Sequence, residues 1–426
     1  MQAGHARKLL IYSFNAALAG SDPLRLVPPY LPKPPTGRTL VLGGGKAAAS
    51  MACAVESNWP ESAPLQGLVV TRYQHSLPTQ RIQVIEASHP LPDGRGAETA
   101  QRMLAQASSL TADDLLLALI SGGGSSLMAL PVAGISLQAL RGVTRSLVNS
   151  GATIQEINIV RKHLTQLAGG QLARAAGAAR VHALILSDVV GDDPTHIASG
   201  PCCVDPSTFA DALAILDRFH IEPDVAILTY LQRGANGEFD DTPKSGDACL
   251  ARTENYVIGS ASRMLAAAQD YFQEQGITVI ILNEAETQFS QLVAQAHARK
   301  VHQILAENKH PRPLALLSGG ETTVATDGGG RGGRNAEYLL ALAIELKGLE
   351  AVYALAADTD GIDGTEDNAG ALIDPSTLSR AQKLGLKPEI LLARHDSYSC
   401  FAALDDLLVT GPTRTNVNDY RAILII

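Results

Sequence analysis

The chain alternates short apolar segments with Ala- and Leu-rich amphipathic stretches, and this alternation restricts its fold more than any other feature. In the first half, segments typical of buried strands occur at 39–42, 67–71, 82–86, 115–120 and 183–187. Helix-like stretches lie between them, among them 47–56, 96–108 and 155–175. Parallel strands covered by helices on both faces show this pattern, because such strands are apolar throughout. We therefore predict an α/β fold with a parallel sheet.

The length of the chain and one polar stretch predict two domains. A chain of 426 residues exceeds what a single core usually holds. The stretch QRGANGEFDDTPKSGD, residues 232–247, is the best candidate for a boundary. Strand candidates resume after it, at 256–258, 278–282, 314–317, 352–356 and 407–410. We predict domains at 1–238 and 239–426, and leave open whether the last strand returns to the first domain.

Composition disfavours several classes of protein. With a net charge of −9 and 4 % aromatic residues, the chain lacks the basic stripe and stacking aromatics of a nucleic-acid binder. Residues 9–19 superficially resemble a signal peptide, but Leu10, Phe14 and Leu18 recur at the spacing of an amphipathic helix. No apolar run approaches the length of a membrane span. Five cysteines without a C-x-x-C pair predict reduced thiols in a cytoplasmic protein.

The loop after the first strand candidate has the composition of an anion site. Ligands of open α/β sheets bind outside the carboxyl ends of the strands. There the sequence VLGGGKAAASMA places Gly43, Gly44, Gly45 and Lys46 where a strand turns into a helix. The loop fits G-x-G-x-x-A, but a dinucleotide site also needs an acidic residue after the next strand, which ends instead in Thr-Arg-Tyr. The alternative is a plain glycine turn with a solvated lysine.

Two further loops of the first half carry candidate ligands. SGGGSSLMALP, residues 121–131, is interpreted as a phosphate-binding nest, with a plain turn as the alternative. It lacks the G-x-S-x-G of a serine nucleophile. Its candidate residues are Ser121, Gly122, Gly123, Gly124, Ser125 and Ser126. In SDVVGDDPTHIASGP, the carboxylates Asp188, Asp192 and Asp193 suit a magnesium ion, or else cap turns.

In the second half, residues 316–346 form the densest candidate site. Glu321 follows a strand, Gly328 to Gly333 form a flexible loop that holds Arg331, and Arg334 and Asn335 begin a helix. We expect Glu321, Arg334 and Asn335 to contact substrate or phosphate. A guanidinium binds phosphate bidentately, although a surface loop of solvated arginines is the alternative.

Three aspartates crowd the end of the next strand. Asp358, Asp360 and Asp363 lie too close together to be stable without a cation, a proton or basic neighbours. A second metal contact through Asp360 would satisfy this requirement, and so would pairing with Arg331 or Arg334.

Taken together, the motifs resemble those of the glycerate 2-kinases of the GckA/TtuD-like type, whose C-terminal half is the MOFRL domain. Nine motifs match in order over nearly the whole chain: GGGKAA, SHPLPD, SGGGSSL, GATIQEINIVRKHLTQLAGG, LSDVVGDDPTHIASGP, LSGGETTV, GRGGRNAEYLLALA, ADTDGIDGTEDNAGA and TGPTRTNVND. The resemblance implies a large N-terminal Rossmann-like α/β/α sandwich and a smaller C-terminal α/β domain, with the active site in the cleft between them. It also implies phosphoryl transfer from ATP, with Mg²⁺, to the 2-hydroxyl of D-glycerate. One departure is Arg414, where many relatives have glycine.

The resemblance implies that Lys46 and Arg331 contact the transferred phosphoryl group. As a hypothesis, the Gly43–Gly45 and Gly122–Gly124 loops hold anionic groups. Asp188 or Asp193 holds magnesium, and one of these carboxylates accepts the hydroxyl proton. A stretch with polar residues at 156, 158, 161 and 162 is either a carboxylate anchor or an ordinary polar helix face.

Two rival functions stay open. One is an NAD(P)H-dependent hydroxypyruvate reductase, a name that relatives have carried, and the other is a non-catalytic nucleotide-binding regulator. The sequence leaves the oligomeric state undecided, a homodimer included, and we expect neither nucleic acid nor membrane as a partner.

Overall fold

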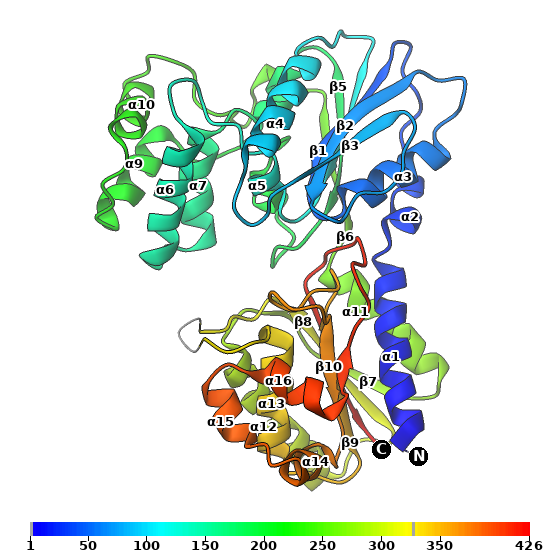
Figure 1. Ribbon diagram of the computed structural model, residues 1–426. Helices are drawn as coiled ribbons and strands as arrows, with labels where there is room; N and C mark the ends of the chain where they lie inside the picture. The colour runs from blue at the N-terminus through cyan, green and yellow to red at the C-terminus, as the bar shows by residue number, and fades with distance from the viewer. Residues whose placement is uncertain (1–2, 326–328) are drawn as a thin grey trace. The chain divides into compact units, whose positions relative to one another are not determined.

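The computed structural model describes residues 3–325 and 329–426, which divide into two compact units (Figure 1). One unit is Pro23–Ile258, and the other joins residues 3–22 to Gly259–Ile426.

The first unit is built on a six-stranded sheet in the order β3-β2-β1-β4-β5-β6. Strands β1 to β5 are parallel to their neighbours, which confirms the predicted parallel sheet. The order reverses between β1 and β4, and ligands of doubly wound sheets bind at such a switch point. The strands are β1 (Thr39–Gly44), β2 (Leu65–Arg72), β3 (Ile82–Ala87), β4 (Leu115–Ile120), β5 (Arg180–Leu186) and β6 (Thr253–Gly259).

Helices cover both faces of this sheet, because alternate residues of each strand point to opposite sides. On one face, Val41, Val69 and Leu117 pack against α3 (Ala48–Asn58). On the other face, Leu42 and Leu116 pack beneath α4 (Gly94–Ala107), α5 (Gly124–Leu127) and α8 (Gln171–Ala175). Short elements complete this part of the chain: α2 (Pro23–Leu26), η1 (Pro28–Tyr30), η2 (Ile197–Ser199) and η3 (Ala248–Leu250).

A separate cluster of four helices extends from the sheet (Figure 1). Its members are α6 (Leu137–Asn149), α7 (Ile154–Leu164), α9 (Phe209–Arg218) and α10 (Val225–Ala235). The stretch 155–175, which reads as one helix in the sequence, is therefore two helices, α7 and α8. The break falls at 165–170, where Gly169 and Gly170 have φ of 57° and 80°. A left-handed backbone cannot continue a right-handed helix.

The second unit contains a mixed sheet in the order β11-β10-β9-β12-β8-β7. Its last strand, β12, lies between β8 and β9 and is antiparallel to both. The strands are β7 (Thr278–Glu286), β8 (Leu314–Gly320), β9 (Val352–Asp358), β10 (Gly370–Ile373), β11 (Leu407–Leu408) and β12 (Asp419–Ile425). The sequence-based prediction missed β10 and β12 and overestimated the length of β11. The last strand stays in this sheet and does not return to the first.

Helices also cover both faces of the second sheet. On one face lie α1 (Ala3–Gly20) and α11 (Ala261–Glu274). On the other lie α12 (Ser290–Glu307), α13 (Arg334–Leu346), α14 (Thr377–Lys383), α15 (Pro388–Ala393) and α16 (Ser397–Leu404). The amphipathic helix predicted near the N-terminus is thus confirmed as α1.

The observed units differ from the predicted domains 1–238 and 239–426 at two places. α1 belongs with the second unit, because its buried side packs on β12: the rings of Phe14 and Tyr420 lie 5.7 Å apart, and the Tyr420 hydroxyl donates to Ser13 at 2.8 Å. The strand at 253–259 completes the first sheet, so the units divide after Ile258. None of the five cysteines, all of which lie in the described residues, forms a disulfide bond. None of the helices described is both long and apolar enough to cross a membrane.

Candidate active site

The two glycine loops predicted to bind anions meet at the switch point of the first sheet. The backbone N–H of Lys46 donates to Gly122 O at 2.8 Å, and that of Ser121 donates to Gly44 O at 3.2 Å. The Ser121 hydroxyl also accepts a hydrogen bond from the amide of Ala47, at 3.1 Å. The loop after β1 and the loop after β4 are therefore cross-linked into one structure at the carboxyl ends of their strands.

The first loop presents a side chain to this edge, and its backbone amides are already used. The amides of Gly45, Lys46, Ala47 and Ala48 donate to Val70 O, Gly122 O, Ser121 Oγ and Gly45 O respectively. The start of α3 therefore keeps no open amide at these four positions for an anion. The used amides differ from our expectation that the Gly43–Gly45 loop itself binds phosphate through its backbone. The group that this loop can still offer to a ligand is the side chain of Lys46, which is partly buried.

In the second loop, by contrast, several backbone amides are open. Within the described chain, the amides of Gly122, Gly123 and Ser125 donate to no acceptor, although those of Gly124 and Ser126 do. Gly123 has φ of 81°, and a left-handed residue in such a loop turns successive N–H groups toward one point. Three open amides in one turn are compatible with the nest predicted at 121–126, and the binding of an anion there stays a prediction.

His89 joins Lys46 at this nest. A Cβ atom on Gly123 would lie 2.9 Å from Nε2 of His89 and 3.5 Å from Cγ of Lys46, so both side chains border the space above the loop. His89 belongs to a turn organised by Asp93, whose carboxylate accepts from the Ser88 amide at 3.1 Å and from the amide of Gly96, in the first turn of α4, at 2.8 Å. Our residue-by-residue reasoning missed His89. The only signal for it was the SHPLPD motif.

The hydroxyl of Ser125 belongs to a buried chain of polar groups. Its Oγ lies 2.8 Å from Oγ of Ser199, which in turn donates to Oδ1 of Asn158 at 3.1 Å. Ser199 has one hydroxyl hydrogen, so Ser125 is the donor in the first contact. This chain ties the nest to α7.

The aspartates that follow β5 differ in their environments. Asp188 is partly buried and lies two residues beyond β5, the strand next to β4. The Asp193 side chain is 51 % exposed and accepts a hydrogen bond from the Thr195 amide at 2.9 Å. Burial acts to raise the pKa of Asp193, but the Thr195 contacts lower it below its usual value. Asp193 therefore caps a turn, one of the two roles that the sequence left open.

No group of three or more His, Cys, Asp or Glu side chains among the described residues is arranged to hold a metal. Magnesium at nucleotide sites is usually held by one or two carboxylates together with substrate phosphates and water. Asp188, at a strand end beside the nest, fits such a partial ligand set.

In the second unit, Arg334 is enclosed by carboxylates. It donates to Asp419 at 2.8 Å, to Asp358 at 2.7 Å and to Glu321 at 2.9 Å. These residues meet because Asp419 begins β12 opposite Asp358, the last residue of β9. Burial alone would lower the pKa of the guanidinium, but the carboxylates raise it well above its usual value. The pairing of Asp358 with Arg334 that the sequence allowed is therefore observed. Contact of Arg334 or Glu321 with substrate or phosphate stays a prediction.

Asn335 and the remaining aspartates complete this network. Nδ2 of Asn335 donates to Asp419 at 2.8 Å, and Asp363 accepts from the amides of Asn335 and Ala336 at the start of α13. Asp360 is buried and accepts a hydrogen bond from the Ile362 amide at 2.9 Å.

Arg331 is more exposed and is held differently. Its guanidinium pairs with Glu366 and lies over the ring of Tyr398, 4.4 Å from the centroid. The loop backbone is anchored as well, since Arg331 O accepts from the Tyr398 amide at 2.9 Å. The described part of the loop is thus fixed to the start of α16. Gly328, also predicted to belong to this loop, lies outside the described residues.

Comparison with known proteins decides the family. A model described as a domain of unknown function, DUF4147, matches residues 9–232, and the MOFRL family model matches residues 314–419. A D-glycerate 2-kinase of Thermotoga maritima is 38 % identical over 99 % of this chain and 98 % of its own. The crystal structure of glycerate kinase from that organism superposes with a TM-score of 0.89, at 37 % identity, and covers 99 % of this chain and 100 % of that one. The chain belongs to the glycerate kinase (MOFRL) family. A protein of Agrobacterium vitis named putative hydroxypyruvate reductase is also similar, at 45 % identity over 99 % of this chain and 94 % of its own.

For a member of the glycerate kinase family, Arg414 is the departure noted in the sequence. It has φ of 61°, a conformation that glycine adopts without a steric penalty. A glycine would therefore fit the backbone at this position, and arginine imposes strain.

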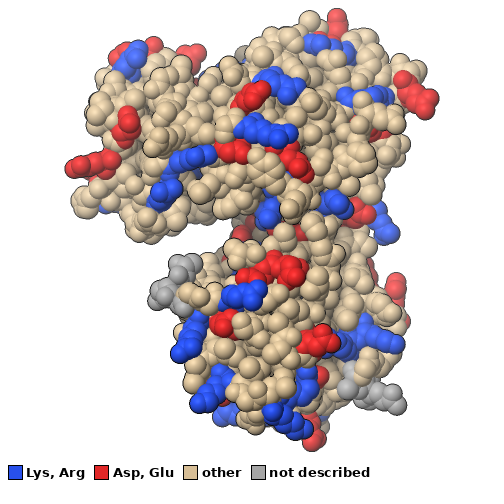
Figure 2. Space-filling model, in the orientation of Figure 1, with Lys and Arg blue, Asp and Glu red and all other residues tan. Residues whose placement is uncertain are grey.

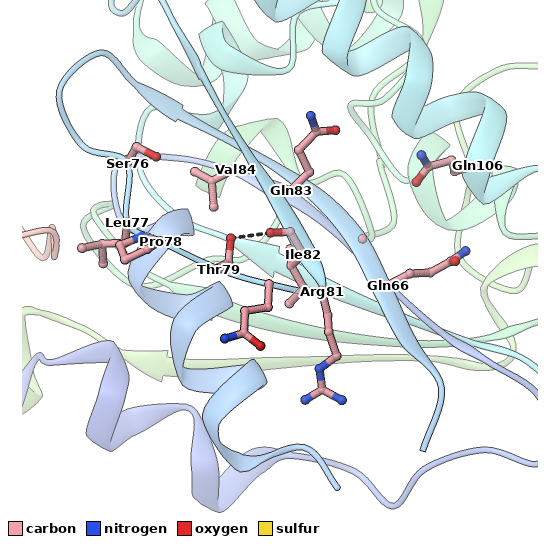
Figure 3. A pocket seen from close by; sticks show the side chains of 12 residues that line it. Gln66, Ser76, Leu77, Pro78, Thr79, Arg81, Ile82, Gln83, Val84 and Gln106 are labelled. Carbon is pink, nitrogen blue, oxygen red and sulfur yellow. Dashed lines mark hydrogen bonds between the residues drawn. The ribbon is translucent and has the colours of Figure 1, made fainter. Parts of the chain in front are cut away.

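A separate hollow, of about 590 Å³, does not contribute to this site (Figure 3). It is lined by the loop before β3 and by residues such as Gly67 and Ile82, which are paired near the amino ends of β2 and β3. The nest lies at the carboxyl ends, and none of the candidate residues lines the hollow. Charged side chains of both signs are interspersed over the visible surface (Figure 2), in keeping with a chain that lacks a basic stripe.

Proposed function

We propose that this protein is a glycerate 2-kinase, which transfers the terminal phosphoryl group of ATP to the 2-hydroxyl of D-glycerate and releases ADP and 2-phosphoglycerate. The observation that carries the proposal is Lys46 beside a nest of three open amides, at the switch point of a doubly wound sheet. The relatives named D-glycerate 2-kinase and glycerate kinase identify the reaction class.

The nest and Lys46 have complementary tasks in this reaction. Phosphoryl transfer depends mainly on positioning and on neutralising charge. The amides of Gly122, Gly123 and Ser125 bind phosphate oxygens through fixed dipoles, which need no reorganisation during the reaction. Lys46 places a positive charge over the same turn, and His89 borders it.

Asp188 is the proposed proton acceptor and the proposed metal ligand. Magnesium, when bound with ATP, would neutralise charge on the phosphate oxygens. Asp188 would hold it with the nucleotide phosphates, and the same carboxylate takes the proton of the attacking hydroxyl. Asp193 and Asp360 stay secondary candidates for the metal, because each is already engaged in a turn.

Arg331 is the proposed second cation for the transferred group. Its side chain is 58 % exposed, so binding a phosphate requires exchange of one ion pair, that with Glu366. Arg334 would instead have to leave three carboxylates. This comparison favours Arg331 as the phosphate ligand and a structural role for Arg334.

The reductase alternative is supported by the names of some relatives and weakened by the geometry of the loop after β1. A dinucleotide pyrophosphate normally binds open amides at the start of the first helix. Here the amides of residues 45–48 are used within the protein, and β2 ends in Thr71 and Arg72 without a carboxylate for the ribose. We further propose a cytoplasmic location, in keeping with five cysteines that form no disulfide bond.

The test is ADP release with ATP, Mg²⁺ and D-glycerate, with phosphorus NMR of the product. We expect acceptor-dependent ADP and a 2-phosphoglycerate signal, and a decrease in turnover of at least about 100-fold in Lys46→Ala with folding intact. Oxidation of NADH or NADPH by hydroxypyruvate, without ADP release from glycerate, would contradict the proposal in favour of the reductase.

A further inference from the structure

Helix α7 passes the nest and carries the four polar side chains that the sequence singled out at 156, 158, 161 and 162, of which three have evident structural partners. Glu156 accepts from the Thr153 amide at 2.8 Å and pairs with an arginine of α9. Asn158 accepts from Ser199 at 3.1 Å. Lys162 is buried and pairs with Asp205 at 3.3 Å. The sequence left open whether this helix face anchors a carboxylate, and these three contacts remove their side chains from consideration.

The fourth side chain, Arg161, has no such partner. Among the described residues, its guanidinium makes neither a hydrogen bond nor an ion pair. It lines a narrow cavity together with Gly124 and Ser125 of the nest and with Ser199, and no acidic residue lines this cavity. Burial lowers the pKa of Arg161 to about 10, so the side chain still carries its charge at neutral pH.

A partly buried cation without a counter-ion is unfavourable unless something compensates its charge. The hydroxyl hydrogens in the cavity are already used, because Ser125 donates to Ser199 and Ser199 donates to Asn158. Among the side chains that line the cavity, the guanidinium is therefore the donor that remains, and it requires an acceptor with negative charge. Its planar fork matches a carboxylate in two parallel hydrogen bonds.

We propose that Arg161 binds the carboxylate of the acceptor and thereby selects the hydroxyl that is phosphorylated. This inference rests on the proposed function. In a 2-hydroxy acid, the 2-hydroxyl is on the carbon next to the carboxylate, and the 3-hydroxyl is one carbon further away. A carboxylate held beside Gly124 and Ser125 therefore limits which hydroxyl reaches a phosphoryl group in the nest.

The experiment compares Arg161→Met and Arg161→Lys with the wild-type enzyme, with D-glycerate or its uncharged amide as acceptor. We expect Arg161→Met to raise KM for D-glycerate by about 10- to 100-fold, to change KM for ATP by less than about threefold, and to leave kcat/KM for the amide almost unchanged. Arg161→Lys keeps the positive charge but not the planar guanidinium, so its KM for D-glycerate should lie between those of the wild type and Arg161→Met. Phosphorus NMR should show an increased share of 3-phosphoglycerate from Arg161→Met.

Arg145→Met is the matched control, because Arg145 is an exposed arginine on the neighbouring helix α6. It should leave every parameter unchanged. If wild-type enzyme releases ADP with D-glycerate but Arg161→Met keeps its KM and its discrimination between acid and amide, the inference is wrong and the kinase proposal stands. If wild-type enzyme releases no ADP with D-glycerate, the proposed function and this inference are both wrong.

Discussion

The guanidinium of Arg334 donates from Nε to both carboxylate oxygens of Asp419, at 2.8 and 3.0 Å. This contact joins the first residue of α13 to the first residue of β12. Asp419 is completely buried and also accepts from Arg421. Because β12 is inserted between β8 and β9, the carboxyl ends of those two strands and the amino end of β12 bring acidic groups to one place, and Arg334 neutralises them.

We expect Arg334→Met to destabilise the protein by about 3 kcal/mol or more, because it leaves the buried carboxylates of Asp419 and Asp358 without their shared cation. Urea unfolding at pH 7 measures the loss. Arg331→Met, at an exposed position three residues earlier, is the control and should unfold nearly as the wild type does. A stable Arg334→Met protein with weakened ATP binding would instead restore Arg334 as a phosphate ligand.

The variants Arg331→Met and Glu366→Gln separate a catalytic role of Arg331 from a structural one. If the guanidinium leaves Glu366 to bind the transferred phosphoryl group, Arg331→Met should lower kcat by about 100-fold or more. Glu366→Gln should stay within a few-fold of wild type, because Glu366 only holds the arginine in the nucleotide-free protein. Steady-state kinetics with saturating ATP measures both. Equal losses in the two variants would show that the ion pair itself supports the loop.

The central strands of the first sheet were predictable because they are buried on both faces and are therefore continuous apolar runs, as in Leu115–Ile120. β10 was missed because its four residues are too short to stand out. β12 was missed because it follows a polar loop and its pairing partners, β8 and β9, end about 60 or more residues earlier. The place of α1 depends on contacts such as Ser13 with Tyr420, which no local pattern contains.

For the site, sequence reasoning found the loops but not their internal hydrogen bonds. Gly-rich segments after strands identify the carboxyl edge of a sheet. Whether the amide of Lys46 is open depends on Gly122, which lies in a different loop, and only the folded chain shows this contact. Sequence reasoning is limited in the same way for Arg334, because a guanidinium can bind a phosphate as well as a carboxylate. Long-range pairing decides between these roles.

The stability of the helix that carries Arg161 should depend on pH through Asp241. This carboxylate lies 3.0 Å from Nε2 of His163 on α7, and its side chain is 27 % exposed. Burial opposes ionisation, but the His163 contact, the Thr242 amide and Lys244 lower the pKa of Asp241 to about 2. Because the folded pKa lies below the unfolded value of 3.8, this stabilisation is complete above about pH 5 and is lost as the pH falls toward 2.

We therefore expect Asp241→Asn to lower the free energy of unfolding by about 1 to 2 kcal/mol at pH 7, with some allowance for solvent screening. The difference from wild type should shrink between pH 5 and pH 2, in urea titrations at a series of pH values. Asp240→Asn, at the exposed neighbouring residue, is the control and should show no such trend. A difference that stays constant over this range would mean that Asp241 acts through packing and not through its charge.

The nest itself can be tested with one methyl group, at Gly123. In Gly123→Ala the new Cβ would lie 2.9 Å from Cδ2 and Nε2 of His89, so the imidazole must move away from the loop. Gly134→Ala is a matched control, because Gly134 has nearly the same φ, 85° against 81°, but nothing within 4 Å of its Cβ position. Both variants should lose about 1 kcal/mol of stability from the left-handed backbone. Only Gly123→Ala should lose activity, by about tenfold or more in kcat/KM, because only there does the methyl group enter the space shared with His89 and Lys46.

The double variant Gly123→Ala/His89→Ala tests whether the two residues act together. Its fold-loss in kcat/KM should be smaller than the product of the two separate losses, since both changes disturb one arrangement. Equal activity in the Gly123→Ala and Gly134→Ala enzymes would place the phosphate away from this loop.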